Sequence, residues 1–77
     1  MTDYNAEIGK WLANQRRNRG YDQEDVGQML GVTSATISRW EAGKRTIHGD
    51  IMIEYCLAIG ADPQDLVRDI VKKEVSS

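Results

Sequence analysis

The chain has 77 residues, of which 40% are hydrophobic and 29% charged, with a formal net charge of −2. This length fits one small domain, and a single cysteine and a single histidine exclude an intramolecular disulfide and leave too few ligands for a zinc site, so we expect no metal or cofactor. The longest apolar run, residues 55–59, is too short to cross a bilayer, and the first residues do not open a signal peptide, so we expect a cytoplasmic protein without a membrane partner.

Glycines and one proline divide the chain into segments whose apolar residues recur every three or four positions. This spacing is typical of one helical face, and no segment alternates apolar and polar residues as a strand would. The sequence therefore predicts an all-α fold with helices over residues 3–19, 22–30, 33–42, 50–59 and from 62 onward.

In the first expected helix, Gly9 occupies an interior position, where glycine is unfavourable. The fourth helix carries an inward apolar stripe that includes Tyr55 and Cys56. In the fifth, which opens with Asp62-Pro63, the residues expected to face inward are Leu66 and Ile70, with Val67 and Val71 as further candidates.

The second and third helices are joined by a very short connection, Gly31-Val32, and their N-caps are expected at Asp22 and Thr33. So sharp a turn requires a residue that tolerates a positive φ, which Gly31 supplies. Two helices that cross this closely also require a very small side chain, which is found at Gly27. These features predict a helix-turn-helix with its core at residues 23–42, inside one domain that spans residues 1–77.

Two stretches, Leu30-Gly31-Val32-Thr33 and residues 37–45 (ISRWEAGKR), resemble the recognition-helix signature of phage-repressor-like (Cro/CI, or XRE) helix-turn-helix domains. The resemblance extends without an internal gap from Ile8 to Leu66. It implies a compact five-helix lambda-repressor-like fold and double-stranded DNA as the partner. The chain departs from the family at Gly27, where alanine is usual and glycine should be harmless, and at Ile47-His48, which replaces the common Pro-Ser.

The third helix divides into two faces at 100° per residue. Ile37, Trp40 and Glu41 lie on the inward face. The outward face has small residues around one arginine, a composition that suits insertion into the major groove. The residues expected to read bases are Ser34, Ala35, Ser38 and Arg39.

Phosphate contacts are expected from residues at the rim of this helix. Gln23 resembles a family glutamine that binds the DNA backbone and braces the recognition helix. Such contacts would position the protein without reading sequence, and for Arg17 a merely solvated surface is an equally good interpretation. The expected phosphate-binding residues are Gln23, Thr33, Thr36, Lys44, Arg45 and Arg17.

Arg16 and Glu41 both fall on the inward sides of their helices. The family pairs an arginine with a glutamate at these places. The resemblance therefore implies a largely buried ion pair that ties the first helix to the third.

The second half of the chain has more apolar residues than its inward stripes require. Ile53 and Leu57 lie off the stripe of the fourth helix, and Val67, Val71 and Val75 form a further row. A homodimer interface within residues 50–75 would explain both sets, and it would place two recognition helices about one DNA turn apart on a palindromic operator. Scattered surface hydrophobes are the other interpretation.

We expect a sequence-specific transcriptional regulator, most simply a repressor, with no enzymatic activity and no small-molecule substrate. Two alternatives remain: the antitoxin of a toxin–antitoxin pair, and a protein-interaction module that retains the fold. Charge leaves the choice open, since residues 1–47 hold seven basic and six acidic side chains whereas residues 48–77 hold three and six.

Overall fold

The computed structural model describes the backbone of residues 4–75 and the side chains of residues 4–72. The five expected helices are all present in this part of the chain. Each begins within one residue of its expected start, and the first four also end within one residue of their expected ends. They are α1 (Tyr4–Asn18), α2 (Gln23–Leu30), α3 (Ser34–Glu41), α4 (Gly49–Ile59) and α5 (Pro63–Val75). The expected all-α fold is thus confirmed, and none of the described helices is long and apolar enough to span a membrane.

Local capping fixes the boundaries of the helix-turn-helix. The Asp22 carboxylate accepts a hydrogen bond from the Asp25 amide at 2.7 Å, and the Asp25 carboxylate accepts one from the Asp22 amide at 2.9 Å. At the start of α3, the Thr33 hydroxyl accepts a hydrogen bond from the Thr36 amide at 3.2 Å. Gly31 ends α2 with a φ of 73°. Each of these boundaries was encoded by residues adjacent to it in the sequence.

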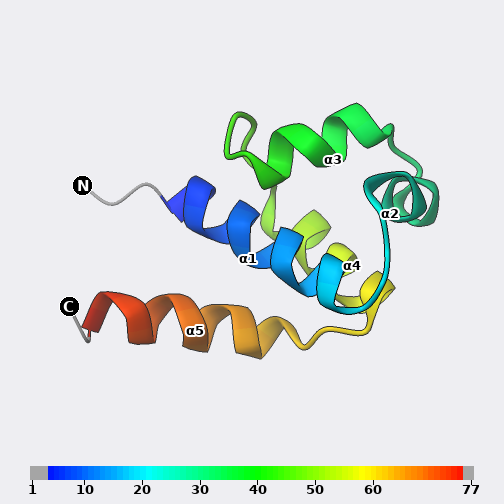
Figure 1. Ribbon diagram of the computed structural model, residues 1–77. Coiled ribbons are helices and arrows are strands. Elements are labelled where there is room, and N and C mark those ends of the chain that lie inside the picture. Colours follow the sequence, from blue (N-terminus) through cyan, green and yellow to red (C-terminus); the bar gives the residue numbers. More distant parts are fainter. Residues whose placement is uncertain (1–3, 76–77) are drawn as a thin grey trace.

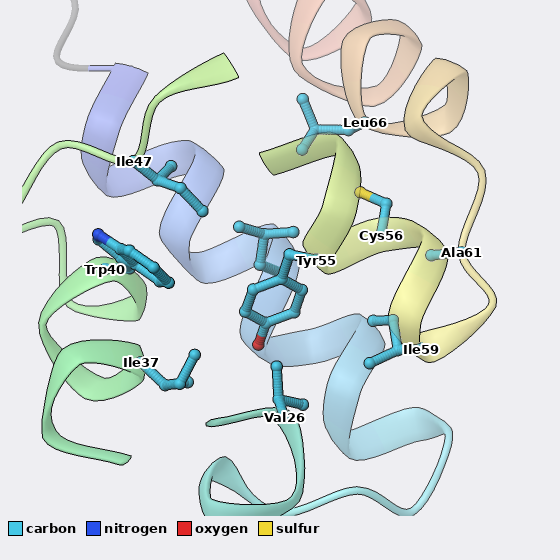
Figure 2. Packing of buried hydrophobic residues seen from close by; sticks show 10 residues of the cluster. Val26, Ile37, Trp40, Ile47, Tyr55, Cys56, Ile59, Ala61 and Leu66 are labelled. Atoms are coloured by element: carbon cyan, nitrogen blue, oxygen red, sulfur yellow. The ribbon is translucent and has the colours of Figure 1, made fainter. Parts of the chain in front are cut away.

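The hydrophobic core is formed by side chains of α1 and α4 together with the inward-facing side chains of α2, α3 and α5. α3 packs against α1 and α2, whereas α5 packs against α1 and α4 (Figure 1). The ring of Tyr55 lies in the middle of the buried cluster (Figure 2). At the periphery, the Trp11 indole N–H donates to the Asp69 carboxylate at 2.8 Å and so links α1 to α5.

The expectation that Val67 and Val71 face inward is wrong. Their exposed fractions are 56% and 53%, whereas Leu66, on the packed face of the same helix, is only 3% exposed. The reason is that α5 contacts the rest of the molecule along one side only. At 100° per residue, that narrow contact buries the Leu66 side and turns the two valines toward solvent.

Two glycines allow helices to approach more closely than any other residue would. A Cβ at Gly9 would collide with the carbonyl oxygens of Trp40 and Glu41, and it would lie 2.8 Å from the Glu41 carbonyl carbon. A Cβ at Gly27 would lie 2.7 Å from the carbonyl oxygen of Val32. Gly9 is therefore the contact point between α1 and the end of α3, and alanine at position 27 would require the turn after α2 to shift.

Replacing Gly9 with alanine should lower the free energy of unfolding by about 1–3 kcal/mol, despite the better helix propensity of alanine, because the methyl group would meet backbone rather than a movable side chain. Chemical denaturation followed by circular dichroism would measure the loss. Gly49→Ala is the matched control, since a Cβ there meets nothing within 4 Å. Equal stabilities of the two variants would contradict the close approach of α1 and α3.

Candidate nucleic-acid interface

The outward face of α3 is formed by residues of small volume around one long cation. Ser34, Ala35, Ser38 and Arg39 are all exposed, while Ile37 on the opposite face is fully buried. Because these exposed side chains are short, a duplex could approach the helix backbone closely, and the Arg39 guanidinium could reach beyond them. The four expected base-reading residues therefore share one accessible surface.

The loop that follows α3 holds two further cations beside Arg39. The backbone carbonyl of Arg39 accepts hydrogen bonds from the amides of Lys44 and Arg45, at 3.0 and 3.3 Å. Farther along, the Thr46 hydroxyl accepts a hydrogen bond from the Asn5 amide group at 3.2 Å, and Ile47 is buried in the core. The substitution of Ile47-His48 for Pro-Ser therefore leaves the loop anchored at both ends.

The other expected phosphate-binding residues are dispersed. Thr33 and Thr36 lie together at the start of α3, with their hydroxyl oxygens 3.0 Å apart. Gln23, at the start of α2, donates its amide to Glu41 at 3.1 Å. Arg17 lies exposed on α1, bonded to Asn14 at 3.2 Å, and has no hydrogen bond to α3. The threonines and Gln23 flank α3, whereas Arg17 projects from α1.

Arg16 and Glu41 form a bidentate ion pair beneath this surface. The Arg16 Nε and Nη2 atoms lie 2.8 and 3.0 Å from Glu41 Oε2 and Oε1, and the two side chains are only 8% and 5% exposed. Arg16 Nη1 also donates to the Tyr21 carbonyl oxygen at 2.9 Å. The pair joins α1 to the last residue of α3, and the third bond fixes the segment that leads into α2.

Two neutral donors complete the environment of the Glu41 carboxylate. Gln23 donates to Oε1 and the Tyr55 hydroxyl donates to Oε2. With the two bonds from Arg16, each carboxylate oxygen accepts two hydrogen bonds, which is the full capacity of the group. From the sequence, Tyr55 was predicted to lie on the apolar stripe of α4, and no polar role was predicted for it. The one available signal was that a buried tyrosine hydroxyl needs a partner.

These contacts shift the ionisation of the network in favour of the observed charges. Burial alone would raise the pKa of Glu41, but hydrogen bonds from Arg16, Tyr55 and Gln23 outweigh it and hold that pKa below its ordinary value. Burial and the neighbouring Glu41 carboxylate raise the pKa of Tyr55, so its hydroxyl remains a donor. Glu41 is consequently ionised, and Tyr55 protonated, throughout the neutral range.

Cysteine and histidine are the residue types that most often carry other chemistry, and the chain has one of each. Cys56 is buried, and burial raises the pKa of its thiol to about 11, which keeps the thiolate form negligible at neutral pH. His48 precedes α4 without a side-chain capping bond. Within the described residues, no group of histidine, cysteine and acidic side chains could hold a metal ion.

Replacing Glu41 with glutamine should lower the free energy of unfolding at pH 7 by about 3–5 kcal/mol, because the buried Arg16 charge loses its partner. Since the folded-state pKa of Glu41 is lowered, its contribution is complete above about pH 4.5 and is lost as pH falls through the folded value. The stability gap between the parent and Glu41→Gln should therefore narrow in acid.

Denaturant unfolding at a series of pH values would measure this gap. The exposed Glu54→Gln variant on α4 is the control and should track the parent at every pH. A gap that stays constant down to pH 3, or a Glu41→Gln variant as stable as the parent, would contradict the assigned ionisation of the network.

Comparisons with known proteins relate this arrangement to a family and to a solved structure. The helix-turn-helix family matches residues 12–66. A solved structure, the restriction-modification controller protein C.AhdI from Aeromonas hydrophila, is similar with a TM-score of 0.77 and 20% identity over 84% of this chain and 98% of that one. No curated protein matches the chain significantly. The structural likeness confirms the lambda-repressor-like fold, and by its family match the chain belongs to the XRE-type helix-turn-helix family of DNA-binding transcription regulators, which are not enzymes.

Proposed function

We propose that the chain regulates transcription by inserting α3 into the major groove of a specific DNA site, and that it acts as a repressor by occupying that site. The observation that carries this proposal is the exposed face of α3, on which Arg39 stands among small side chains. Arg39 can donate two hydrogen bonds to guanine, while the Ala35 methyl group can contact a thymine methyl. Ser34 and Ser38 can donate or accept and therefore discriminate weakly.

Phosphate contacts from the rim would orient α3 in the groove. Lys44 and Arg45 support this role best, because the bonds from their amides to the Arg39 carbonyl hold both cations at the end of the reading helix. Thr33 and Thr36 lie at the other end of α3. The Gln23 side-chain amide already donates one N–H to Glu41. Its second N–H and its backbone amide are the groups that can bind a phosphate. Arg17 has the weakest support.

A homodimer would give the domain a second reading helix. Ile53 and Leu57 on α4 are 46% and 66% exposed, and Val67 and Val71 add an exposed apolar row on α5. These four residues are the dimer surface of the proposal, and the side chain of Val75 lies outside the described residues. Burial of such surfaces against a second copy is favourable, and a two-fold arrangement would match a palindromic operator.

The selection of DNA from a randomised duplex library at physiological salt tests the reading of sequence. With the selected site, Arg39→Ala should lose about 1–3 kcal/mol of binding free energy and relax the preference at one base pair. Lys44→Ala is the matched variant: it should weaken binding to all sequences equally and reduce the slope of log K against log salt by about 1. No enriched sequence with the parent protein, or equal behaviour of the two variants, would contradict the assignment of roles.

The dimer is tested by Leu57→Lys, which places a charge at the most exposed apolar residue of the surface. We expect the parent to sediment as a dimer and Leu57→Lys as a folded monomer, because burial of the lysine charge would oppose association. Met29→Lys is the control, since Met29 is an exposed apolar residue on α2, outside the surface. A parent that remains monomeric both at high concentration and on its selected DNA would overturn the dimer, and the same surface would then be assigned to a different protein partner.

A further inference from the structure

Tyr55 carries the one hydroxyl group in the buried core cluster of the described chain. Its side chain is fully buried, and the other members of the cluster are aliphatic residues, Cys56 and Trp40. Figure 2 shows the ring at the centre of the cluster, with the hydroxyl directed toward the space beside Ile37 and Val26. Apolar packing alone would be satisfied by phenylalanine, and a buried hydroxyl is costly without a partner. The role of this oxygen must therefore be sought in its bond to Glu41.

The hydrogen bond from Tyr55 to Glu41 connects α4 with α3, two helices whose backbones do not contact each other. No Cα atom of α3 lies within 8 Å of a Cα atom of α4. The Tyr55 side chain spans this gap and ends on Glu41, the last residue of α3. Arg16 and Gln23 bind the same carboxylate from α1 and from the start of α2. The hydroxyl thus adds an attachment of α3 to α4 that backbone packing does not provide.

The attachment point is well placed to control the reading face. Glu41 follows Arg39 by two residues on the opposite side of α3, so fixing Glu41 restricts rotation of the helix about its own axis. The Arg39 carbonyl also holds the loop with Lys44 and Arg45. A small rotation of α3 would therefore move all three cations together.

We propose that Tyr55 is a positioning residue for DNA reading, which acts through its hydroxyl bond to Glu41 to hold α3 in the orientation that directs Arg39 into the groove. This inference rests on the proposed function of α3. It assigns to Tyr55 an effect on sequence discrimination, in addition to any effect on stability. A hydrogen bond to a charged group is strong enough to change an equilibrium between two orientations by about tenfold.

The test compares Tyr55→Phe, which removes only the hydroxyl, with Ile59→Val. Ile59 is buried on the same helix, one turn away, and has no polar atom near Glu41, so this control destabilises the same core without touching the network. Both variants are assayed at a temperature at which circular dichroism shows them fully folded. Two quantities are measured: amide hydrogen exchange in α3 relative to α1, and the affinity ratio between the selected duplex and a scrambled one.

For Tyr55→Phe we expect exchange at residues 38–42 to accelerate about three- to tenfold more than exchange in α1, and the affinity ratio to fall by a similar factor, with binding to scrambled DNA nearly unchanged. Ile59→Val should change exchange in both helices alike and leave the ratio intact. If Tyr55→Phe behaves as Ile59→Val does in both measurements, the hydroxyl serves stability alone and the inference is overturned.

The failure of the proposed function would be recognised separately. If the parent protein selects no DNA sequence, the reading of DNA by α3 fails, and the exchange measurement alone decides whether Tyr55 holds α3. Selective acceleration in α3 would support the role of Tyr55 in holding α3, whereas uniform acceleration in α1 and α3 would overturn that role as well.

Discussion

The buried carboxylate of Glu41 is the constraint on which the arrangement of the domain depends. It accepts hydrogen bonds from Arg16 of α1, Gln23 of α2 and Tyr55 of α4, so three helices are fixed to the end of α3 at one group. A buried ion pair gains little net free energy over apolar residues of the same size, because both charges lose their hydration. What it provides is geometry. Any other orientation of α3 would leave a carboxylate lone pair or the Arg16 charge unpaired, at a cost that an apolar contact would not impose.

The orientation that Glu41 imposes on α3 matters because the two helices of the helix-turn-helix are not stable on their own. α2 and α3 have eight residues each, which is below the length at which isolated helices are stable in water. Capping by Asp22 and Thr33 satisfies one amide in the first turn of each helix, but it does not orient one helix relative to another. Orientation comes from the close approach at Gly9, from the packing of Ile37 and Trp40, and from the Glu41 network. The exposed face of α3 needs no stabilising residues, and it is therefore available for other contacts.

Sequence reasoning succeeded where the signal was local. The caps, Gly31 and the helical periodicity predicted five helices, and the boundaries of the helix-turn-helix are encoded by residues next to them. Several features that depend on which helix faces which were missed. Gly9 looked like an unfavourable helix residue because the carbonyl groups that crowd it lie more than thirty positions away in the chain. Val67 and Val71 looked like core candidates because periodicity does not tell how wide the contact of α5 is. The placement of Arg16 beside Glu41 was expected through family resemblance alone, and Tyr55 was expected only as an apolar residue.

α4 connects the two surfaces on which the proposed function depends. Its inner side carries Tyr55, which is hydrogen-bonded to Glu41 at the end of α3, and its outer side carries the exposed Ile53 and Leu57 of the proposed dimer surface. In a dimer formed there, the spacing between the two copies of α3 would be set by how rigidly α3 is attached to α4 within each copy. Side-chain packing alone leaves α3 some freedom to turn about its axis. A hydrogen bond to the Glu41 carboxylate, whose acceptor positions are all occupied, restricts both the direction and the distance between the two bonded groups. A polar link between α3 and α4 would therefore make the half-site spacing a property of the folded monomer, fixed before DNA is bound.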